Sequence, residues 1–289
     1  MKRIERPGRG GTDFQLRHWD DLWGSLTPEE VEAAIRYERI LPLACKAFSP
    51  GSKLLEAGCG TGKYCLALSR LGYDMTGIDF APAGLEIMRR MAPELRAVLG
   101  SVADMPFATG AFDGALSLGV VEHFEEGPEK PIAELARVIR PGGTLFLTVP
   151  YHSLVADWND LVSPRFTAGD ESTTFYQYLF RRQEMAERLL AAGFDIRRVD
   201  YLGKALGLSA LQLWSNRGMP PPAQTAVGTA PVNNRPKYES PVQWLKNLFK
   251  GATPGLAQSL RSAQLRLVET ILPGPVCAHL VAYTATRRA

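Results

Sequence analysis

Apolar residues along this chain follow two different periods. Short apolar runs at 53–57, 74–78, 95–99, 111–118 and 144–149 have the length and continuity of strands that are covered on both faces. Between them lie segments with helical spacing, such as 131–139, which gathers its apolar residues on one side. Strands that alternate with helices at short intervals predict an α/β fold with a doubly wound parallel sheet and right-handed crossovers.

Helical patterns also flank this series. Residues 12–50 are expected to be helical, with a capping box from Thr27 to Glu30 and a stop near Pro42. Residues 182–192 predict a helix that leads into a sixth strand at 194–201, and 276–286 predicts a seventh. Residues 223–241 are rich in Pro, Thr, Ala and Asn, which favours a flexible segment between these strands.

These patterns predict a domain plan. We expect a disordered basic N-terminus at 1–11 and one domain over 12–289. The domain would consist of N-terminal helices at 12–50, a core at 51–202, a partly flexible insertion at 203–275 and a last strand at 276–289.

Composition narrows the possible partners. Lys and Arg number 33 against 30 Asp and Glu, a balance of +3 that does not favour nucleic acid. The four cysteines form no C-x-x-C pair, so we expect buried free thiols in a reducing, cytoplasmic environment. No apolar run reaches the roughly 18 residues of a membrane span. The amphipathic stretch 242–271 is either a core-packed or lid helix pair, or a peripheral membrane contact.

The segment from Lys53 to Asp79 has the pattern of a nucleotide-binding strand–turn–helix–strand unit. Its turn reads Gly58-Cys-Gly60-Thr-Gly62, which differs from the dinucleotide pattern G-x-G-x-x-G. Glu56, two residues before the first glycine, would repel a pyrophosphate but attract an ammonium group. Asp79, at the end of the second strand, can accept both hydroxyl groups of a ribose. Together these residues suit an amino acid joined to a nucleoside.

The chain resembles the class I S-adenosylmethionine-dependent methyltransferases in this unit and in later segments. These are Gly100–Phe107, Ala111-Phe-Asp113, Ser117–Phe124, Val138–Leu145, Tyr178–Glu184 and Ala191–Phe194. The resemblance implies a Rossmann-like seven-stranded sheet of order 3-2-1-4-5-7-6 with strand 7 antiparallel. It would carry an N-terminal helical lid and a helical insertion between strands 6 and 7.

The same resemblance implies S-adenosyl-L-methionine as cofactor and S-adenosyl-L-homocysteine as product. In the family's pattern Asp104 would bond the adenine amino group, with the Met105 amide nearby. The implied cofactor-binding residues are Glu56, Gly58, Cys59, Gly60, Gly62, Asp79, Phe80, Asp104, Met105 and Gly119.

Two histidines are candidates for a general base. His123 follows strand four at the rim of the expected pocket; otherwise it orders the loop or touches the cofactor. His152 follows strand five. Related quinone O-methyltransferases have an E-x-x-E-H segment at the position of Gly119–His123, and its carboxylates bind a metal. This chain has Gly119 in place of the first Glu, so we expect no metal.

The expected function is methyl transfer to an O, N or C nucleophile of a small-molecule acceptor. The acceptor pocket would be built by 12–36, 151–180 and part of 203–275, and Trp244 and Phe249 suit a hydrophobic or lipid-like acceptor. The alternatives are a tRNA or protein methyltransferase and a non-catalytic S-adenosylmethionine-binding protein. The segment 17–23, with two indoles, is either an anchor for the first helix or part of a lid. Oligomeric state has no signal in the sequence.

Overall fold

The computed structural model describes residues 1–7, 11–36, 40–154, 156–157, 173–203 and 273–289. The chain divides into two compact units. The first comprises Met1–Tyr151, Thr167–Asp200 and Val281–Ala289, and the second comprises His152–Phe166 and Tyr201–Leu280. The predicted insertion falls in the second unit, and 204–272 lies outside the described residues.

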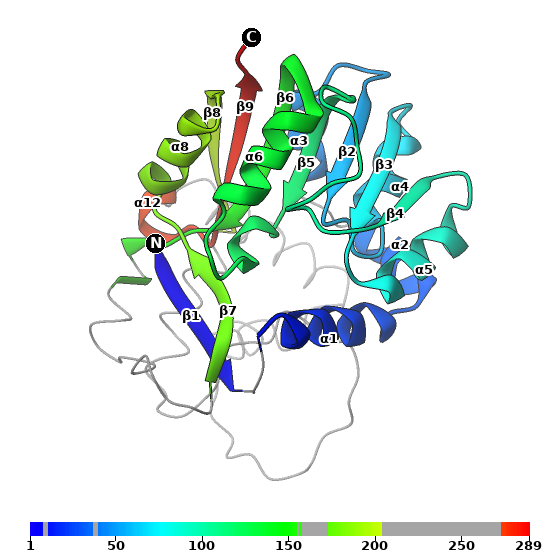
Figure 1. The fold of residues 1–289 in the computed structure, drawn as a ribbon, viewed down its shortest axis with the longest axis horizontal. Helices are drawn as coiled ribbons and strands as arrows, with labels where there is room; N and C mark the ends of the chain where they lie inside the picture. Colours follow the sequence, from blue (N-terminus) through cyan, green and yellow to red (C-terminus); the bar gives the residue numbers. More distant parts are fainter. Residues whose placement is uncertain (8–10, 37–39, 155, 158–172, 204–272) are drawn as a thin grey trace, which may run out of the picture. The chain divides into compact units, whose positions relative to one another are not determined.

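A seven-stranded sheet of order β4-β3-β2-β5-β6-β9-β8 forms the centre of the first unit (Figure 1). Its strands are β2 (Lys53–Ala57), β3 (Asp74–Asp79), β4 (Arg96–Leu99), β5 (Phe112–Leu118), β6 (Ile139–Pro150), β8 (Phe194–Leu202) and β9 (Leu280–Arg287). The five strands from β4 to β6 pair in parallel. This order confirms the predicted 3-2-1-4-5-7-6 topology.

The last two strands run in opposite directions. Leu202 at the end of β8 accepts a bond from His279 N, just before β9, at 3.0 Å. Gly193, just before β8, accepts one from Arg288 N, just after β9, at 2.8 Å. Pairing of one strand's end with the other's start is the antiparallel pattern that was predicted.

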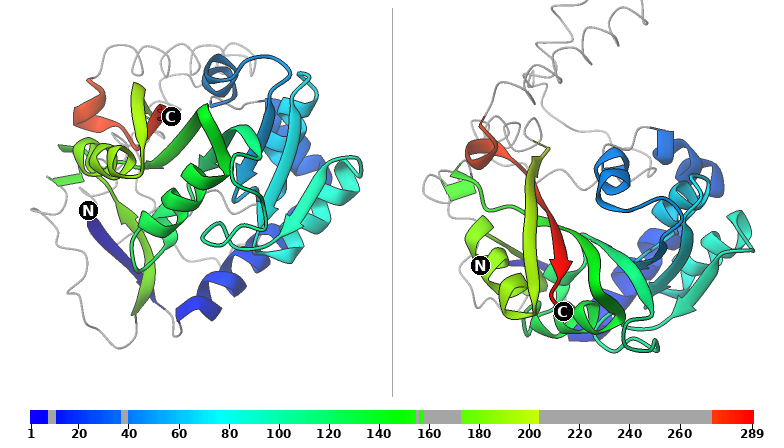
Figure 2. Two further views of the ribbon diagram at one scale, coloured as in Figure 1. Left: turned by 45° about the horizontal axis from the view of Figure 1, so that its top comes forward. Right: turned by 90° about the horizontal axis from the view of Figure 1, so that it is seen from above.

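Helices cover both faces of this sheet (Figures 1 and 2). One face carries α3 (Leu41–Ala47) and α4 (Lys63–Ser69); the other carries α6 (Glu129–Val138) and α8 (Arg182–Ala191). Beside α4 lie α2 (Pro28–Arg36) and α5 (Pro82–Met91), and α1 (Gly11–Gly24) packs on α5. The short 3-10 helix η1 (Val121–His123) follows β5. Fully buried core side chains include Leu54, Leu55, Ile78, Leu116, Phe146 and Tyr283.

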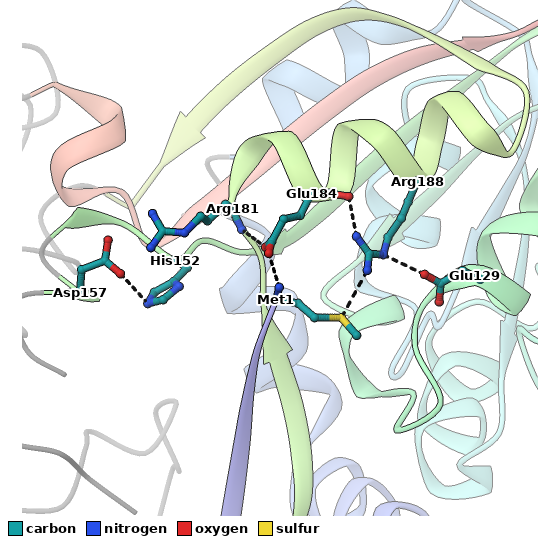
Figure 3. A network of polar contacts seen from close by, with 7 residues as sticks. All are labelled: Met1, Glu129, His152, Asp157, Arg181, Glu184 and Arg188. Carbon is teal, nitrogen blue, oxygen red and sulfur yellow. Dashed lines mark hydrogen bonds and ion pairs between the residues drawn. The ribbon is translucent and has the colours of Figure 1, made fainter.

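A second, two-stranded sheet contradicts the prediction of a disordered N-terminus. Residues Lys2–Pro7 form β1, which pairs antiparallel with β7 (Thr173–Leu179). The Met1 amine also forms an ion pair with Glu184, and Arg188 bonds Glu129 at 2.8 Å (Figure 3). The basic sequence was a poor guide because β1 gains its hydrogen bonds from a strand about 170 residues away.

Two element boundaries also differ from expectation. The helix begun at Thr27 was expected to stop near Pro42, but α2 ends at Arg36 and Pro42 lies in the first turn of α3. Proline fits there because the first-turn N–H groups have no intrahelical partner. The seventh strand was expected from Val276, but Gly274–Cys277 form the short helix α12 and β9 begins at Leu280. Gly274 packs against Tyr201 within the second unit.

Among the described residues, no helix combines the length and the apolar character required to cross a bilayer.

Candidate functional site

The glycine-rich turn after β2 has a backbone that favours glycine. Gly58, Gly60 and Gly62 have φ angles of +78°, +50° and +73°, in the left-handed region where a Cβ is strained. A Cβ at Gly58 would overlap Val120, and one at Gly60 would lie 2.9 Å from the Trp23 indole. Val120 and Trp23 therefore occupy the positions that side chains at Gly58 and Gly60 would take, and the turn tolerates only glycine there.

The turn is tied to the neighbouring strand. The N–H groups of Gly58 and Cys59 both donate to Ile78 O of β3, at 2.8 and 3.0 Å. The Cys59 side chain is buried, and so is Cys65 on α4. Burial raises the pKa of the Cys65 thiol well above its ordinary value, so this thiol is protonated and unreactive. Cys59 lines the turn through its backbone.

Glu56 is buried beneath this turn. Its Oε2 accepts a hydrogen bond from Cys65 N in the first turn of α4, at 2.8 Å. Burial raises the pKa of its carboxyl to about 7. The carboxylate thus satisfies one of the N–H groups that a helix N-terminus leaves open. The geometry gives Glu56 a role in holding the turn on α4, in addition to its predicted attraction for an ammonium group.

Asp79 at the end of β3 connects the second strand to the glycine turn. Its Oδ2 accepts from Gly60 N at 2.8 Å, and its Oδ1 accepts from Ala81 N at 2.9 Å. Burial raises the pKa of the carboxyl above its ordinary value, against the opposing effect of these backbone bonds. Each oxygen keeps a second lone pair for a ligand hydroxyl. The next residue, Phe80, is partly exposed.

The segment after β4 is clamped by two side chains of α6. Glu134 Oε2 accepts from Met105 N at 2.8 Å. Arg137 donates to Met105 O at 2.9 Å and to Phe107 O at 2.6 Å, and it pairs with Glu134 at 2.7 Å. Asp104 is exposed, whereas Met105 is buried. The Met105 N–H that was expected near adenine is engaged with Glu134, so any Met105 contact to a ligand would use its other atoms.

Glu134 and Arg137 were not anticipated from the sequence. They lie on a helix that was predicted from its apolar residues alone, and an acid and a base three residues apart on a helix usually form a surface pair. Their role depends on α6 lying opposite the segment after β4. That arrangement follows from the order of the strands in the sheet, which the residues themselves do not indicate.

The carboxyl end of β5 brings a glycine and a buried acid together. Gly119 has φ +72°, and its N–H donates to Thr148 O at 3.1 Å. A Cβ built on Gly119 would lie 3.5 Å from Glu122 Oε1. Glu122 is 2% exposed, and in the part of the chain that the structure describes its Oε2 has no hydrogen-bond partner. Burial raises the pKa of this carboxyl to about 8.

His123 is held in one orientation beside this acid. Its Nδ1 lies 2.7 Å from Tyr176 O on β7. A carbonyl only accepts, so Nδ1 carries a proton. Its Nε2 lies 3.9 Å from Glu122 Oε1, beyond hydrogen-bond distance but close enough for charges to interact.

Aromatic side chains from two separate elements, α1 and β7, contact His123 or one another beside it. The Trp19 ring on α1 meets His123 edge-on at 5.0 Å and stacks on Trp23 at 5.5 Å. The Tyr176 ring meets His123 at 5.1 Å. The same contacts extend to two further rings of α1, His18 and Phe14. The segment 17–23 therefore lies between the glycine turn and His123.

His152 belongs to the second unit. Its Nε2 forms an ion pair with Asp157 Oδ1 at 3.2 Å (Figure 3). The catalytic role predicted for His152 stays a prediction. Within the described ranges, no cluster of three or more His, Cys, Asp or Glu side chains is arranged to hold a metal ion.

The sheet order and the glycine turn define the class of the protein. Ligands of doubly wound sheets bind beyond the carboxyl ends of the strands, where the strand order reverses. In this sheet the reversal lies between β2 and β5, which carry the glycine turn and Gly119. A nucleotide-binding turn, an acid on the next strand and an antiparallel β9 describe a class I methyltransferase fold.

Comparison with known proteins agrees. The family model described as a methyltransferase domain matches residues 55–147. The ubiquinone biosynthesis O-methyltransferase of Xanthomonas campestris pv. campestris is 27% identical over 187 residues, covering 61% of this chain and 77% of that protein. The malonyl-[acyl-carrier protein] O-methyltransferase of Serratia marcescens is 36% identical over 118 residues, covering 40% and 45%.

Solved structures share the fold. An S-adenosylmethionine-dependent methyltransferase from Methanosarcina mazei superimposes with a TM-score of 0.52 at 16% identity, covering 86% of this chain and 97% of that one. Residues 55–147 thus carry a methyltransferase domain, the solved structures share the class I fold, and the matches together support S-adenosylmethionine-dependent methyltransferase activity.

Proposed function

We propose that this methyltransferase acts on a hydroxyl oxygen of a small, ring-bearing acceptor. The observation that carries the proposal is the aromatic wall of Trp19, His123 and Tyr176 beside Gly119, with the imidazole held in one orientation. Flat rings suit an aromatic acceptor, and a fixed imidazole suits an acceptor that must lose a proton. Two relatives are named ubiquinone biosynthesis O-methyltransferase and malonyl-[acyl-carrier protein] O-methyltransferase, and both names describe transfer to an oxygen.

The residues at the carboxyl ends of β2 and β3 fit S-adenosylmethionine. The positive φ angles of Gly58, Gly60 and Gly62 leave this backbone without side chains beyond the carboxyl end of β2, where a ligand can approach it closely. We propose that Asp79 binds the ribose hydroxyls through its remaining lone pairs and that Phe80 lies against the adenine. We further propose that the exposed carboxylate of Asp104 accepts from the adenine amino group. Gly58–Gly62 and Gly119 would border the amino acid portion, with S-adenosylhomocysteine as product.

The cofactor supplies an electrophilic methyl group on a sulfonium. The chain's own part is then to orient the acceptor, exclude water and receive a proton. Orientation alone is worth several kcal/mol, on the order of 7–11 in good intramolecular cases. Trp19 and Trp23 on α1 would cover the reacting groups, and His123 would receive the proton. The cytoplasmic location remains a prediction from cysteine usage.

Two measurements test the proposal. Calorimetric titration with S-adenosylhomocysteine should show binding, and wild-type protein with tritiated S-adenosylmethionine should label phenols such as 3,4-dihydroxybenzoate. Matched amines, thiols, fatty acids, total tRNA and a protein lysate form the rest of the panel. Label confined to tRNA or protein would refute a small-molecule acceptor. Label confined to amines or thiols would refute an oxygen acceptor.

A further inference from the structure

Glu122 is the most unusual ionisable group of the site. A carboxyl oxygen that is buried without a hydrogen-bond partner costs folding free energy, and native proteins rarely keep one without a reason. Among the described residues, no other buried side-chain N or O atom lacks a partner. The two other buried acids of the site, Asp79 and Glu56, accept hydrogen bonds from the N–H groups of Gly60 and Cys65.

The position of Glu122 relative to His123 suggests the reason. The Nδ1–H of His123 is committed to Tyr176 O, so the proton chemistry of the ring falls on Nε2. Nε2 lies 3.9 Å from Glu122 Oε1. At that distance the carboxylate does not bond the nitrogen, but an opposite charge 4–6 Å away favours the protonated ring. The side chain of His123 is 11% exposed and that of Glu122 is 2% exposed, so an acceptor would approach from the His123 side.

We propose that Glu122 is a positioning residue whose carboxylate stabilises the protonated imidazole of His123, so that His123 takes the proton of the acceptor hydroxyl during methyl transfer. The hydroxyl proton passes to Nε2 as the oxygen's electron pair forms the bond to the methyl carbon. The electrons of the broken S–C bond stay on sulfur, which becomes a neutral thioether. This inference rests on the proposed oxygen acceptor.

The carboxyl of Glu122 holds its proton more tightly than an exposed glutamate does. Burial raises the pKa of Glu122 to about 8, and interacting groups of this kind titrate as a unit. The active base is neutral imidazole beside ionised carboxylate, a state that fills as pH rises past the pKa of Glu122, and it gains the acceptor's proton to become the ion pair. Among the described residues, Tyr176 on β7 is the titratable ring that contacts His123, and it in turn contacts His18 on α1. Glu125, two residues along the chain, is paired with Arg3 of β1 at 2.6 Å.

The first test needs no acceptor. The chain has four histidines, so each imidazole can be followed by NMR as pH is varied, with His123 assigned by loss of its signal in His123→Gln. Glu122→Gln, which keeps the size and removes the charge, should lower the midpoint of His123 by about one pH unit or more. Glu125→Gln, an exposed acid of the same segment, is the matched control and should leave the midpoint unchanged. An unchanged His123 midpoint in folded Glu122→Gln overturns the proposal.

The second test separates this role from its rivals. With the phenol that the wild type methylates, Glu122→Gln should lose at least about a hundredfold in kcat with KM for the phenol within threefold. S-adenosylhomocysteine affinity should also stay within threefold; a parallel loss would assign Glu122 to the cofactor's ammonium group. Selective broadening of the His123 signal by Mn²⁺ would assign the pair to a metal. Either result overturns the proposal. If the wild type methylates no hydroxyl compound, the acceptor class fails, and the NMR midpoint still decides the pairing of Glu122 with His123.

Discussion

Removing the Arg137 clamp should weaken cofactor binding without changing any residue that touches the cofactor. In Arg137→Ala the segment after β4 loses the bonds to Met105 O and Phe107 O, and Glu134 loses its partner. Glu134 would keep its bond from Met105 N. The segment that carries Asp104 would then be tied to α6 by that bond and by Gly110 N, which donates to Arg137 O at 2.9 Å.

The magnitude follows from those two carbonyl bonds. Hydrogen bonds from charged groups contribute about 1.5–3 kcal/mol each in buried surroundings. The Arg137 side chain is 33% exposed, so we take about 1 kcal/mol each, below that range, because water screens an exposed charge. If cofactor binding must fix the loosened segment in place again, the binding free energy falls by about 2 kcal/mol, and Kd rises on the order of 30-fold.

Calorimetric titration with S-adenosylhomocysteine measures this loss. Arg90→Ala is the matched control, because Arg90 forms only an exposed pair with Glu86 on α5 and should leave Kd unchanged. Arg137→Lys, which keeps the charge but loses the forked geometry, should fall between wild type and Arg137→Ala. A Kd within threefold of wild type in folded Arg137→Ala would refute the reasoning.

Three further predictions concern the cradle and the buried acids. Asp79→Asn should lose on the order of a hundredfold in S-adenosylhomocysteine affinity while its circular dichroism stays native; unchanged affinity in calorimetry would remove Asp79 from the ribose site. Gly58→Ala should lower the free energy of unfolding by about 2–4 kcal/mol in urea titrations, because of the positive φ and the overlap with Val120; wild-type stability would contradict the geometry. Glu56 and Glu122 have folded pKa values of about 7 and 8, above the roughly 4.3 of an unfolded Glu. The folded chain therefore keeps protons that the unfolded chain has released, and stability falls as pH rises from about 5 to 8. Glu122→Gln should flatten that decline in urea unfolding at pH 5, 6, 7 and 8, and an identical slope would contradict the raised pKa.

The parts of the molecule that depend on local sequence could be predicted. The glycine turn and Asp79 lie within 25 residues of each other in the sequence, and the predicted helix at 182–192 is α8, Arg182–Ala191. The sheet order followed from the family resemblance, and the positions of its strands followed from their apolar runs. These features depend on interactions between near neighbours or on a pattern shared by many proteins.

The parts that depend on distant partners could not be predicted. β1 reads as a basic tail because its bonding partner β7 lies far along the chain. Glu134 reads as a surface acid because its partner Met105 N is a backbone group with no sequence signature. In the sequence Glu122 is simply the second acid of the E-x-x-E-H pattern. Only the structure shows that its side chain is buried and that one of its oxygens has no hydrogen-bond partner among the described residues.

The β1–β7 pair has a consequence for comparing this enzyme with its relatives. Tyr176 O, which orients His123, belongs to a strand held by β1 on one side and by Gln15 Nε2 of α1 at 3.0 Å. All three segments lie outside the matched family region, residues 55–147. Acceptor choice can therefore diverge through changes near residues 2–7, 14–23 and 173–179 while the shared region stays the same. Relatives grouped by that region alone would share a methyl donor without sharing a substrate.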